Sequence, residues 1–258
     1  MRRSYSGLLG RFSRGVRGIF TFLTIIPLGG SLEDAAEYFY LAPLVGFTVG
    51  LASSPPALIP NVLGPVLALS LTYVLNGFQH MDGYIDFGET LLSRRVGEEA
   101  LRILKDTHRG SFAIAVAVVT ILVASASAIS LGRLMIYALP PITSASSLSM
   151  FITAYLGRTR GSGLGHMFAS PSKRPIKLLW AHLTYVAPLL ALTPIMPNWW
   201  IWAIALELAL SWICSVSVVK VSHGRLGFIN GDVLGFTNEL CKSASLVVFA
   251  ILGAYRLI

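Results

Sequence analysis

Long apolar runs dominate this sequence and most constrain its fold. Several of them approach or exceed the roughly 18 to 20 residues that a helix needs to cross about 30 Å of hydrocarbon. Hydrophobic residues make up 54% of the 258-residue chain and charged residues only 12%, whereas a typical soluble domain is about a quarter charged. A soluble fold could not bury so much apolar surface. We therefore expect an all-α, polytopic bundle of helices in a lipid bilayer.

Seven apolar stretches are the expected membrane spans: 39–58, 62–78, 111–131, 134–156, 178–195, 199–219 and 243–258. The segment 18–28 is too short to cross and contains Pro27 near its end, which favours a re-entrant or interfacial position. No internal repeat, low-complexity tract or linker divides the sequence. Residues 1–258 are therefore expected to form one membrane-embedded catalytic domain.

The basic residues are distributed unevenly between the two ends of these spans. With the N-terminus inside, 18 of the 20 lysines and arginines fall in the N-terminal arm and in the loops 79–110, 157–177 and 220–242. Only Arg133 and Arg256 fall outside. Because cytoplasmic loops of membrane proteins are enriched in Lys and Arg, the pattern predicts a plasma-membrane protein whose active face is cytoplasmic. The net charge of +8 then reflects orientation and not nucleic-acid binding.

The segment 80–90 is the strongest candidate for chemistry. It holds Asp82, Asp86 and Glu89 at spacings i, i+4 and i+7, which in a helix places three carboxylates on one face. A divalent cation removes their repulsion, and magnesium commonly binds one or two carboxylates together with substrate phosphates. We therefore predict a Mg²⁺ site here. The alternative is a solvated acidic helix end balanced by the two arginines that follow.

Two further polar segments are candidates for contact with an anionic substrate. Asp106 is placed to return to the carboxylates and Arg109 to face a phosphate, although the pair equally fits a helix cap and an interfacial anchor. Arg158 and Arg160 lie in the glycine-rich basic loop 157–177. Such a loop can surround an anion, or it can merely fix the orientation of the protein in the membrane.

A fourth segment repeats glycine every four residues, at Gly227, Gly231 and Gly235, around Asp232. Small residues at this spacing permit helices to approach closely, which is the structural reading. Asp232 and Glu239 lie seven positions apart and so share a helical face beside a span. A charge in such a place is a functional candidate.

With these segments in this order, the chain resembles the cobalamin synthase family, the adenosylcobinamide-GDP ribazoletransferases. The family's acidic motif is matched by His80, Asp82, Gly83, Asp86 and Glu89, and its Lys-Asp-Ser-x-x-Gly motif by Lys105, Asp106, Thr107 and Gly110. Its C-terminal motif is matched, with one extra residue after the first glycine, by Gly227, Gly231, Asp232, Leu234, Gly235 and Glu239. The segments FLTIIP (22–27) and PLVGFTVG (43–50) also resemble the family's opening. The chain departs from the pattern in Glu89 for an aspartate, Arg109 for a small apolar residue and Asn230 for a hydroxyl residue.

The resemblance implies a phosphotransfer. A hydroxyl of α-ribazole, or of its 5′-phosphate, would attack the cobinamide-side phosphorus of adenosylcobinamide-GDP, and GMP would leave. Magnesium on Asp82, Asp86 and Glu89 would neutralise the pyrophosphate. Asp106 or Asp232 would accept the hydroxyl proton or complete the metal site. The implied substrate-binding residues are His80, Arg109, Arg158, Arg160, Gly231 and Glu239.

Two other functions fit the sequence less well. A CDP-alcohol phosphotransferase uses similar chemistry, but Gln79 stands where its first aspartate belongs and its Ala-Arg pair is absent. A membrane transporter would use Glu207 in mid-span, but no broken-helix pair or inverted repeat flanks it. A hydrogen bond from Glu207 to a neighbouring helix, for example at His182, is favoured instead. Cys214 and Cys241 follow no disulfide or zinc pattern. Oligomeric state is left open, a homo-oligomer included.

Overall fold

The computed structural model describes residues 7–108, 110–255 and 257–258, and in this part of the chain the regular structure is entirely helical. Its α-helices are α1 (Leu8–Leu23), α2 (Leu32–Glu37), α3 (Ala42–Ser53), α4 (Leu63–Leu75), α5 (Gln79–Leu92), α6 (Gly97–Lys105), α7 (Ser111–Leu131), α8 (Met135–Leu156), α9 (Gly163–Ser172), α10 (Pro175–Leu192), α11 (Trp200–Arg225) and α12 (Gly231–Ala254). Four short 3₁₀ turns join them: η1 (Phe39–Leu41), η2 (Pro55–Leu58), η3 (Gly132–Leu134) and η4 (Thr193–Ile195).

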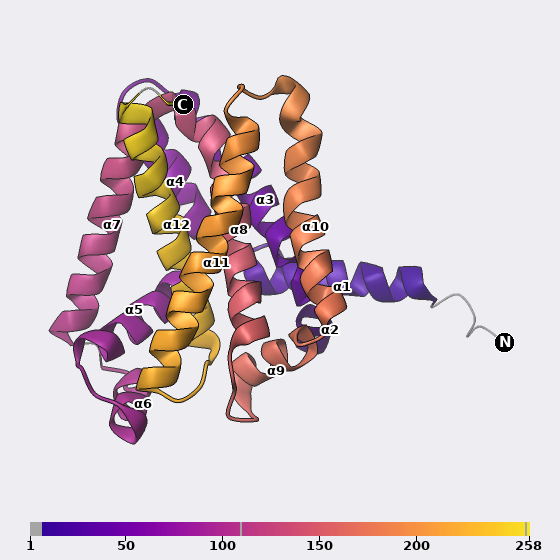
Figure 1. The fold of residues 1–258 in the computed structure, drawn as a ribbon, viewed down its shortest axis with the longest axis vertical. Coiled ribbons are helices and arrows are strands. Elements are labelled where there is room, and N and C mark those ends of the chain that lie inside the picture. The colour runs from indigo at the N-terminus through magenta and orange to yellow at the C-terminus, as the bar shows by residue number, and fades with distance from the viewer. Residues whose placement is uncertain (1–6, 109, 256) are drawn as a thin grey trace.

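Five segments in the described residues are long and apolar enough to cross a membrane: Phe39–Leu58, Ser111–Leu156, Pro175–Ile195, Trp200–Arg225 and Gly231–Ala254. The second of these consists of α7 and α8, which run in opposite directions on either side of η3 (Figure 1). The helix α4 is apolar but shorter. The expectation of an all-helical membrane protein is therefore confirmed, with five candidate spanning segments.

The predicted boundaries at the C-terminal end were wrong. The stretch 220–242 was expected to be a loop, but α11 continues to Arg225 and α12 already begins at Gly231. The early start has a local cause, because the side chain of Asn230 accepts a hydrogen bond from the backbone N–H of Val233 at 3.1 Å and so caps the helix. As a result, the residues of the C-terminal motif stand on the first turns of a membrane-length helix.

The helix α8 lies at the centre of the bundle, in contact with α3, α10, α11 and α12. It is buried along most of its length, and its neighbour α3 approaches it through small residues. A Cβ added to Gly50 would lie 2.7 Å from the carbonyl oxygen of Leu139, and Ser144 donates a hydrogen bond to the carbonyl of Pro43 at 2.8 Å. Close backbone approach of this kind is how helices associate where lipid surrounds them.

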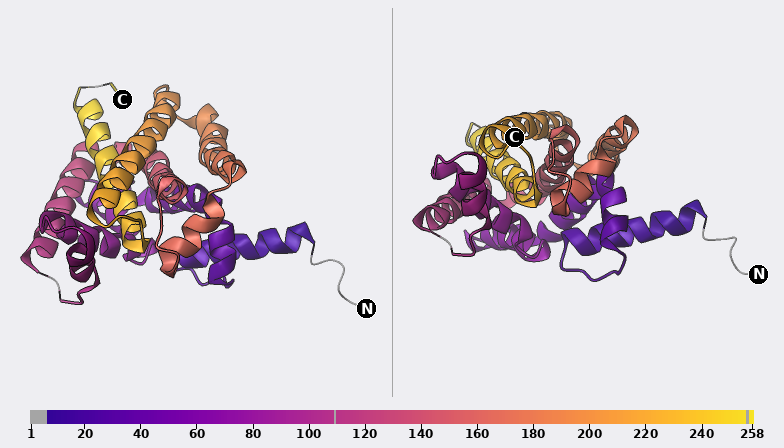
Figure 2. Two further views of the ribbon diagram at one scale, coloured as in Figure 1. Left: turned by 60° about the horizontal axis from the view of Figure 1, so that its bottom comes forward. Right: turned by 90° about the horizontal axis from the view of Figure 1, so that it is seen from below.

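The amphipathic and polar helices gather at one end of the bundle. In Figure 1, α2, α5, α6 and α9 lie at the lower end, while α1 runs across the bundle and projects from it. Both views of Figure 2 show the same projection of α1. The segment 18–28 thus belongs in part to a longer helix, since α1 covers Leu8–Leu23. The loops predicted at 79–110 and 157–177 also hold helices, namely α5, α6 and α9.

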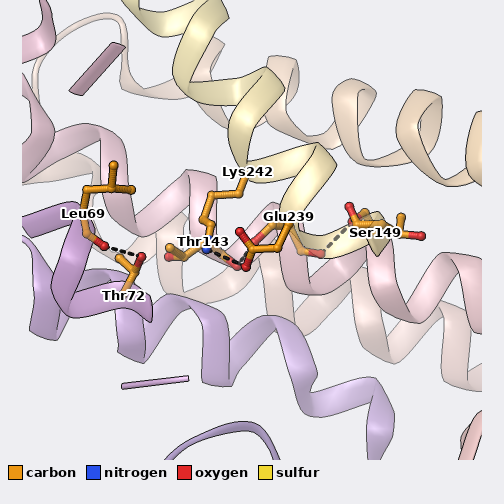
Figure 3. A network of polar contacts seen from close by, with 8 residues as sticks. Leu69, Thr72, Thr143, Ser149, Glu239 and Lys242 are labelled. Carbon is orange, nitrogen blue, oxygen red and sulfur yellow. Dashed lines mark hydrogen bonds and ion pairs between the residues drawn. The ribbon is translucent and has the colours of Figure 1, made fainter. Parts of the chain in front are cut away.

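The two carboxylates and the lysine in the interior of the long helices are held by specific partners. Lys242 and Glu239, both on α12 and each 1% exposed, form an ion pair of 2.7 Å (Figure 3). The ammonium of Lys242 also lies 4.0 Å from the ring centre of Tyr73 on α4. On α11, the carboxylate of Glu207 accepts a hydrogen bond from Ser245 of α12 at 2.7 Å.

The partner predicted for Glu207 was wrong, although its bond to a neighbouring helix is confirmed. His182 is engaged elsewhere, because its Nε2 accepts a hydrogen bond from the indole of Trp212 at 3.0 Å. The bond to Ser245 instead joins α11 to α12 and gives Glu207 a structural role. The two cysteines, Cys214 and Cys241, are both free and buried.

The ion pair of α12 leads to the first prediction. In Lys242→Met the carboxylate of Glu239 stays buried without its cation, so we expect the free energy of unfolding in detergent to fall by about 3 to 5 kcal/mol. Adding Glu239→Gln should restore most of this loss, because no buried charge is then left unpaired. The measurement is unfolding by denaturant, followed by helical circular dichroism. Equal stability of Lys242→Met and the parent would contradict the pairing.

Candidate functional site

A cavity of about 220 Å³ opens where α5, α9 and α12 meet the end of α1. One wall is polar and carries His80 and Asp82 of α5 and Asp232 of α12. The other wall is apolar and consists of Phe22, Leu23, Phe39, Met150, Leu164 and Phe168. A cavity with a few convergent polar groups on an apolar background is typical of a ligand-binding site.

The polar wall exists because α5 and α12 touch backbone to backbone. A Cβ added to Gly83 would lie 2.9 Å from both the Cα and the carbonyl oxygen of Asp232. A Cβ on Gly235 would lie 3.1 Å from the carbonyl oxygen of His80. Beside these glycines the rings of Tyr84 and Phe236 stack with centres 4.7 Å apart. The two acidic motifs predicted from sequence therefore face each other across this helix pair.

The remaining glycines of the C-terminal motif act differently from the prediction. Gly227 lies before α12 with φ of +85°, a conformation that L side chains rarely adopt. A Cβ on Gly231 would meet only the Cβ of Leu164, at an ordinary 3.8 Å. Of the three glycines, only Gly235 makes the close helix contact that the four-residue spacing suggested. Gly165 of α9 packs instead against the backbone at 230 and 231.

Asp232 is oriented by the residue that caps its own helix. The side-chain amide of Asn230 donates a hydrogen bond to Oδ2 of Asp232 at 2.7 Å, while its oxygen accepts from Val233. Asn230, which departs from the family pattern, thus makes both contacts at once. The carboxylate of Asp232 lies in the first turn of α12, where the helix dipole favours a negative charge.

His80 is the buried polar residue of the cavity wall, with 6% of its surface exposed. Burial lowers the pKa of His80 to about 3, and the nearby charge of Lys242 contributes in the same direction. The imidazole is therefore neutral at physiological pH and carries one N–H donor and one acceptor nitrogen. It can donate a single hydrogen bond to a substrate oxygen without bringing a charge.

The three carboxylates predicted to share a helix all lie on α5, but their exposure differs. Asp82 is exposed and lines the cavity, whereas Asp86 and Glu89 are buried further along the same helix. Oε1 of Glu89 accepts a hydrogen bond from the backbone N–H of Gly110 at 2.9 Å. The acidic motif is thereby joined to the segment 105–110, as the sequence suggested for Asp106, although through the backbone.

Asp106 directly follows α6 as its C-cap residue, and its Oδ1 accepts a hydrogen bond from the backbone N–H of His108 at 2.8 Å. It is not among the residues that line the cavity. Arg109, the predicted phosphate ligand next to it, lies outside the described residues.

The two arginines of the basic loop take part in contacts between connecting segments. The side chain of Arg160 pairs with Glu98 of α6 and lies 4.9 Å from the ring centre of Phe228. That pairing lowers the pKa of the Glu98 carboxyl. The backbone N–H of Arg158 donates to Nε2 of His223 at 3.0 Å, and its side chain is exposed. Neither arginine lines the cavity.

Sequence reasoning missed the apolar wall of the cavity and the buried lysine of α12, Lys242. Phe22 and Leu23 close the cavity from the end of α1, where the amide of Gln79 donates to the carbonyl of Phe22 at 2.7 Å. The likeness of the FLTIIP segment to the family's opening was the only signal for them. Lys242 matched no motif, yet it binds Glu239, which the structure buries instead of placing in the cavity.

The carboxylates of the cavity are of the kind that a magnesium ion needs. Among the described residues, no three His, Cys, Asp or Glu side chains form a ready-made metal cluster. The cavity does present two carboxylates, those of Asp82 and Asp232. Because magnesium is usually held by one or two carboxylates plus substrate phosphates, and not by an all-protein cage, these two residues fit the ion.

Comparisons with known proteins find a family and relatives that cover most of the chain. The family model described as cobalamin-5-phosphate synthase matches residues 15–250. An adenosylcobinamide-GDP ribazoletransferase of Thermococcus kodakarensis is 28% identical over 243 residues, covering 93% of this chain and 100% of the relative. One of Clostridium perfringens is 28% identical over 258 residues, covering 93% and 99%. One of Saccharolobus islandicus is 32% identical over 171 residues, covering 62% and 67%. No solved structure matches the chain.

The contact between α5 and α12 predicts the effect of one methyl group. Gly83→Ala should force the two helices apart, since the backbone of Asp232 cannot yield, and we expect a loss of about 1 to 3 kcal/mol in stability. The matched control is Gly224→Ala on α11, where an added Cβ meets nothing within 4 Å. Unfolding of both variants in detergent provides the measurement. Indistinguishable midpoints for the two would refute the close approach.

Proposed function

Because the chain belongs to the cobalamin-5-phosphate synthase family, we propose that the cavity between α5, α9 and α12 is where it joins α-ribazole to adenosylcobinamide-GDP. The protein is a transferase of cobalamin synthesis and an adenosylcobinamide-GDP ribazoletransferase by family. The main support for placing the reaction in this cavity is that Asp82 and Asp232, from two separate motifs, both line it.

The reaction forms one phosphorus–oxygen bond and breaks another. A hydroxyl of α-ribazole, or of its 5′-phosphate, attacks the cobinamide-side phosphorus, and the bond from that phosphorus to the GMP oxygen breaks. Asp232 is the proposed acceptor of the hydroxyl proton, because it lines the cavity and its orientation is fixed by Asn230. The neutral imidazole of His80 is placed to donate a hydrogen bond to a phosphate oxygen.

Magnesium would be held by Asp82 together with substrate phosphates, with Asp232 or the neighbouring Asp86 as the second carboxylate. When bound, the ion would offset the charge of the pyrophosphate and of the departing GMP. Glu89 is supported less well as a ligand, since Oε1 of its carboxylate already accepts a hydrogen bond from Gly110. Asp106 is proposed to order the loop before α7 through its bond to His108.

The groups that lie outside the cavity are proposed to meet the rest of the substrate. A cavity of about 220 Å³ is below the roughly 300 to 1,000 Å³ of a pocket for a drug-sized ligand. It therefore holds the reacting phosphates and the attacking sugar, while the corrinoid lies outside. Arg158 and Arg160, exposed on the same end of the bundle, remain candidates for the nucleotide's phosphate or guanosine groups.

The proposed topology has seven crossings of the plasma membrane: Phe39–Leu58, α4, α7, α8, α10, α11 and α12. It places the cavity on the cytoplasmic side, and its support is the excess of basic residues on the loops at that end. A cytoplasmic cavity would also give the protein direct access to GDP-linked substrates.

The activity test uses the purified protein in liposomes with adenosylcobinamide-GDP, α-ribazole and magnesium. The parent should release GMP together with a corrinoid product. Asp82→Ala, Asp86→Ala and Asp232→Asn should each reduce turnover at least 100-fold, because the loss of a metal ligand or of a positioned base removes several kcal/mol of transition-state stabilisation. Arg133→Gln, at the opposite end of the bundle, is the control. Near-normal turnover of all three acidic variants at saturating magnesium would overturn the site.

The topology is tested by labelling single cysteines in intact cells. Val96→Cys, in the turn between α5 and α6, should be protected from a membrane-impermeant thiol reagent, and Asn198→Cys should react. The background is low because the native thiols of Cys214 and Cys241 are buried. Reaction at position 96 with protection at 198 would reverse the orientation.

A further inference from the structure

The helix α1 has two chemically distinct faces along its exposed half. At about 100° per residue, Arg11, Arg14 and Arg17 fall within an arc of about 120°. Phe12, Val16 and Phe20 fall on the opposite side, and the buried residues Ile19 and Leu23 lie on this same apolar side. The apolar face therefore begins at the bundle and continues outward along the part of α1 that leaves it.

The outward part of α1 is open to its surroundings. Phe12 is 46% exposed, although Ile19 is fully buried, and the three arginines are exposed. In Figures 1 and 2, α1 projects sideways from the bundle, across the direction of α7, α10 and α12. Because those helices are membrane-length, a helix lying across them near their polar end is parallel to the bilayer surface.

The N-terminal segment that includes α1 carries only positive charge, although the acidic helix α2 packs beside it. The sequence places five arginines in residues 1–17, and its first acidic residue is Glu33. Arg14 lies 3.9 Å from the carboxylate of Asp34, in a partly exposed pair that contributes little. The face that carries Arg11 and Arg17 is thus available to an external anion.

We propose that α1 is an interfacial helix that binds the anionic phospholipid headgroups of the bilayer in which the bundle sits. Phe12, which is 46% exposed, lies at the acyl-chain boundary, while Val16 and Phe20 continue the apolar face inward and pack partly on the core of the bundle. Arg11, Arg14 and Arg17 contact lipid phosphates. An apolar face opposite a basic face is the pattern of helices that lie in the membrane interface and prefer anionic lipids. A single basic residue near such a surface strengthens binding about fivefold, so three together contribute on the order of 100-fold.

The position of α1 matters for the cavity that its end closes. Phe22 stacks on Phe168 of α9 with ring centres 4.5 Å apart, and both line the cavity. A headgroup contact at Arg11 to Arg17 therefore anchors the same rigid helix that supplies one wall of the site. Lipid binding by α1 does not depend on the proposed reaction.

The test places an environment-sensitive fluorophore on Phe12→Cys in the full-length protein. Vesicles of phosphatidylcholine alone are compared with vesicles that contain 30% phosphatidylglycerol. In the anionic vesicles we expect blue-shifted emission and protection from iodide, both reversed by 0.5 M salt because exposed charges are then screened. The triple variant Arg11→Gln, Arg14→Gln and Arg17→Gln should lose the difference between the two lipid mixtures. The parent protein, whose own two cysteines are buried, is treated with the same fluorophore to measure background labelling.

The matched control removes three other exposed arginines of the same end of the bundle, Arg94, Arg95 and Arg102, each changed to Gln. This control carries the same net charge as the triple variant of α1 and should keep the full lipid response. Equal burial of the label in both lipid mixtures would contradict the preference for anionic headgroups. An equal response of the two triple variants would show that general charge, and not α1, attracts the lipid. Because the readout is fluorescence, lipid binding is tested independently of whether the protein turns over its substrates.

Discussion

The cavity depends on one backbone contact, the crossing of α5 and α12. Gly83 lies on the backbone of Asp232, and Gly235 lies on the backbone of His80. Only residues without a side chain allow two helices to approach so closely, and the approach is what brings carboxylates from distant parts of the sequence into one wall. The aromatic pair Tyr84 and Phe236 then packs beside the crossing and fixes its position. Gly83 and Gly235 therefore set the geometry of the crossing, and the acidic residues beside them are the ones proposed to carry the chemistry.

Behind this wall, the interior of the bundle is unusually polar for a chain surrounded by lipid. Lys242 neutralises Glu239 and rests on the ring of Tyr73, and Glu207 is bonded to Ser245. A charge without a partner at this depth would be costly. The pair of Lys242 and Glu239 lies within α12 and contacts α4 through Tyr73, and the bond between Glu207 and Ser245 joins α12 to α11. The same helix carries Asp232 at its N-terminal end. The rigidity of α12 along its length is thus a condition for holding that carboxylate in place.

The sequence predicted those features that depend on local pattern. The apolar run 111–131 is α7 to the residue, and the i, i+4, i+7 spacing correctly placed Asp82, Asp86 and Glu89 on one helix. It could not say which polar residues share a cavity, because that depends on packing between helices far apart in the chain. Glu239 shares a helix with Asp232 but forms an ion pair with Lys242. No sequence motif included Lys242. The start of α12 was placed too late in the sequence because the prediction followed hydropathy. The first turns of this helix are polar, and Asn230 caps them.

The central claim is that the reacting phosphates lie at the crossing of α5 and α12. A structure of the protein in lipid nanodiscs, with magnesium and a non-hydrolysable analogue of adenosylcobinamide-GDP, would test it most directly. We expect pyrophosphate density within the cavity, in contact with Asp82 and close to Asp232, with Phe22 and Phe168 on its apolar side. Density for the pyrophosphate at the opposite end of the bundle, near Arg133, would contradict it.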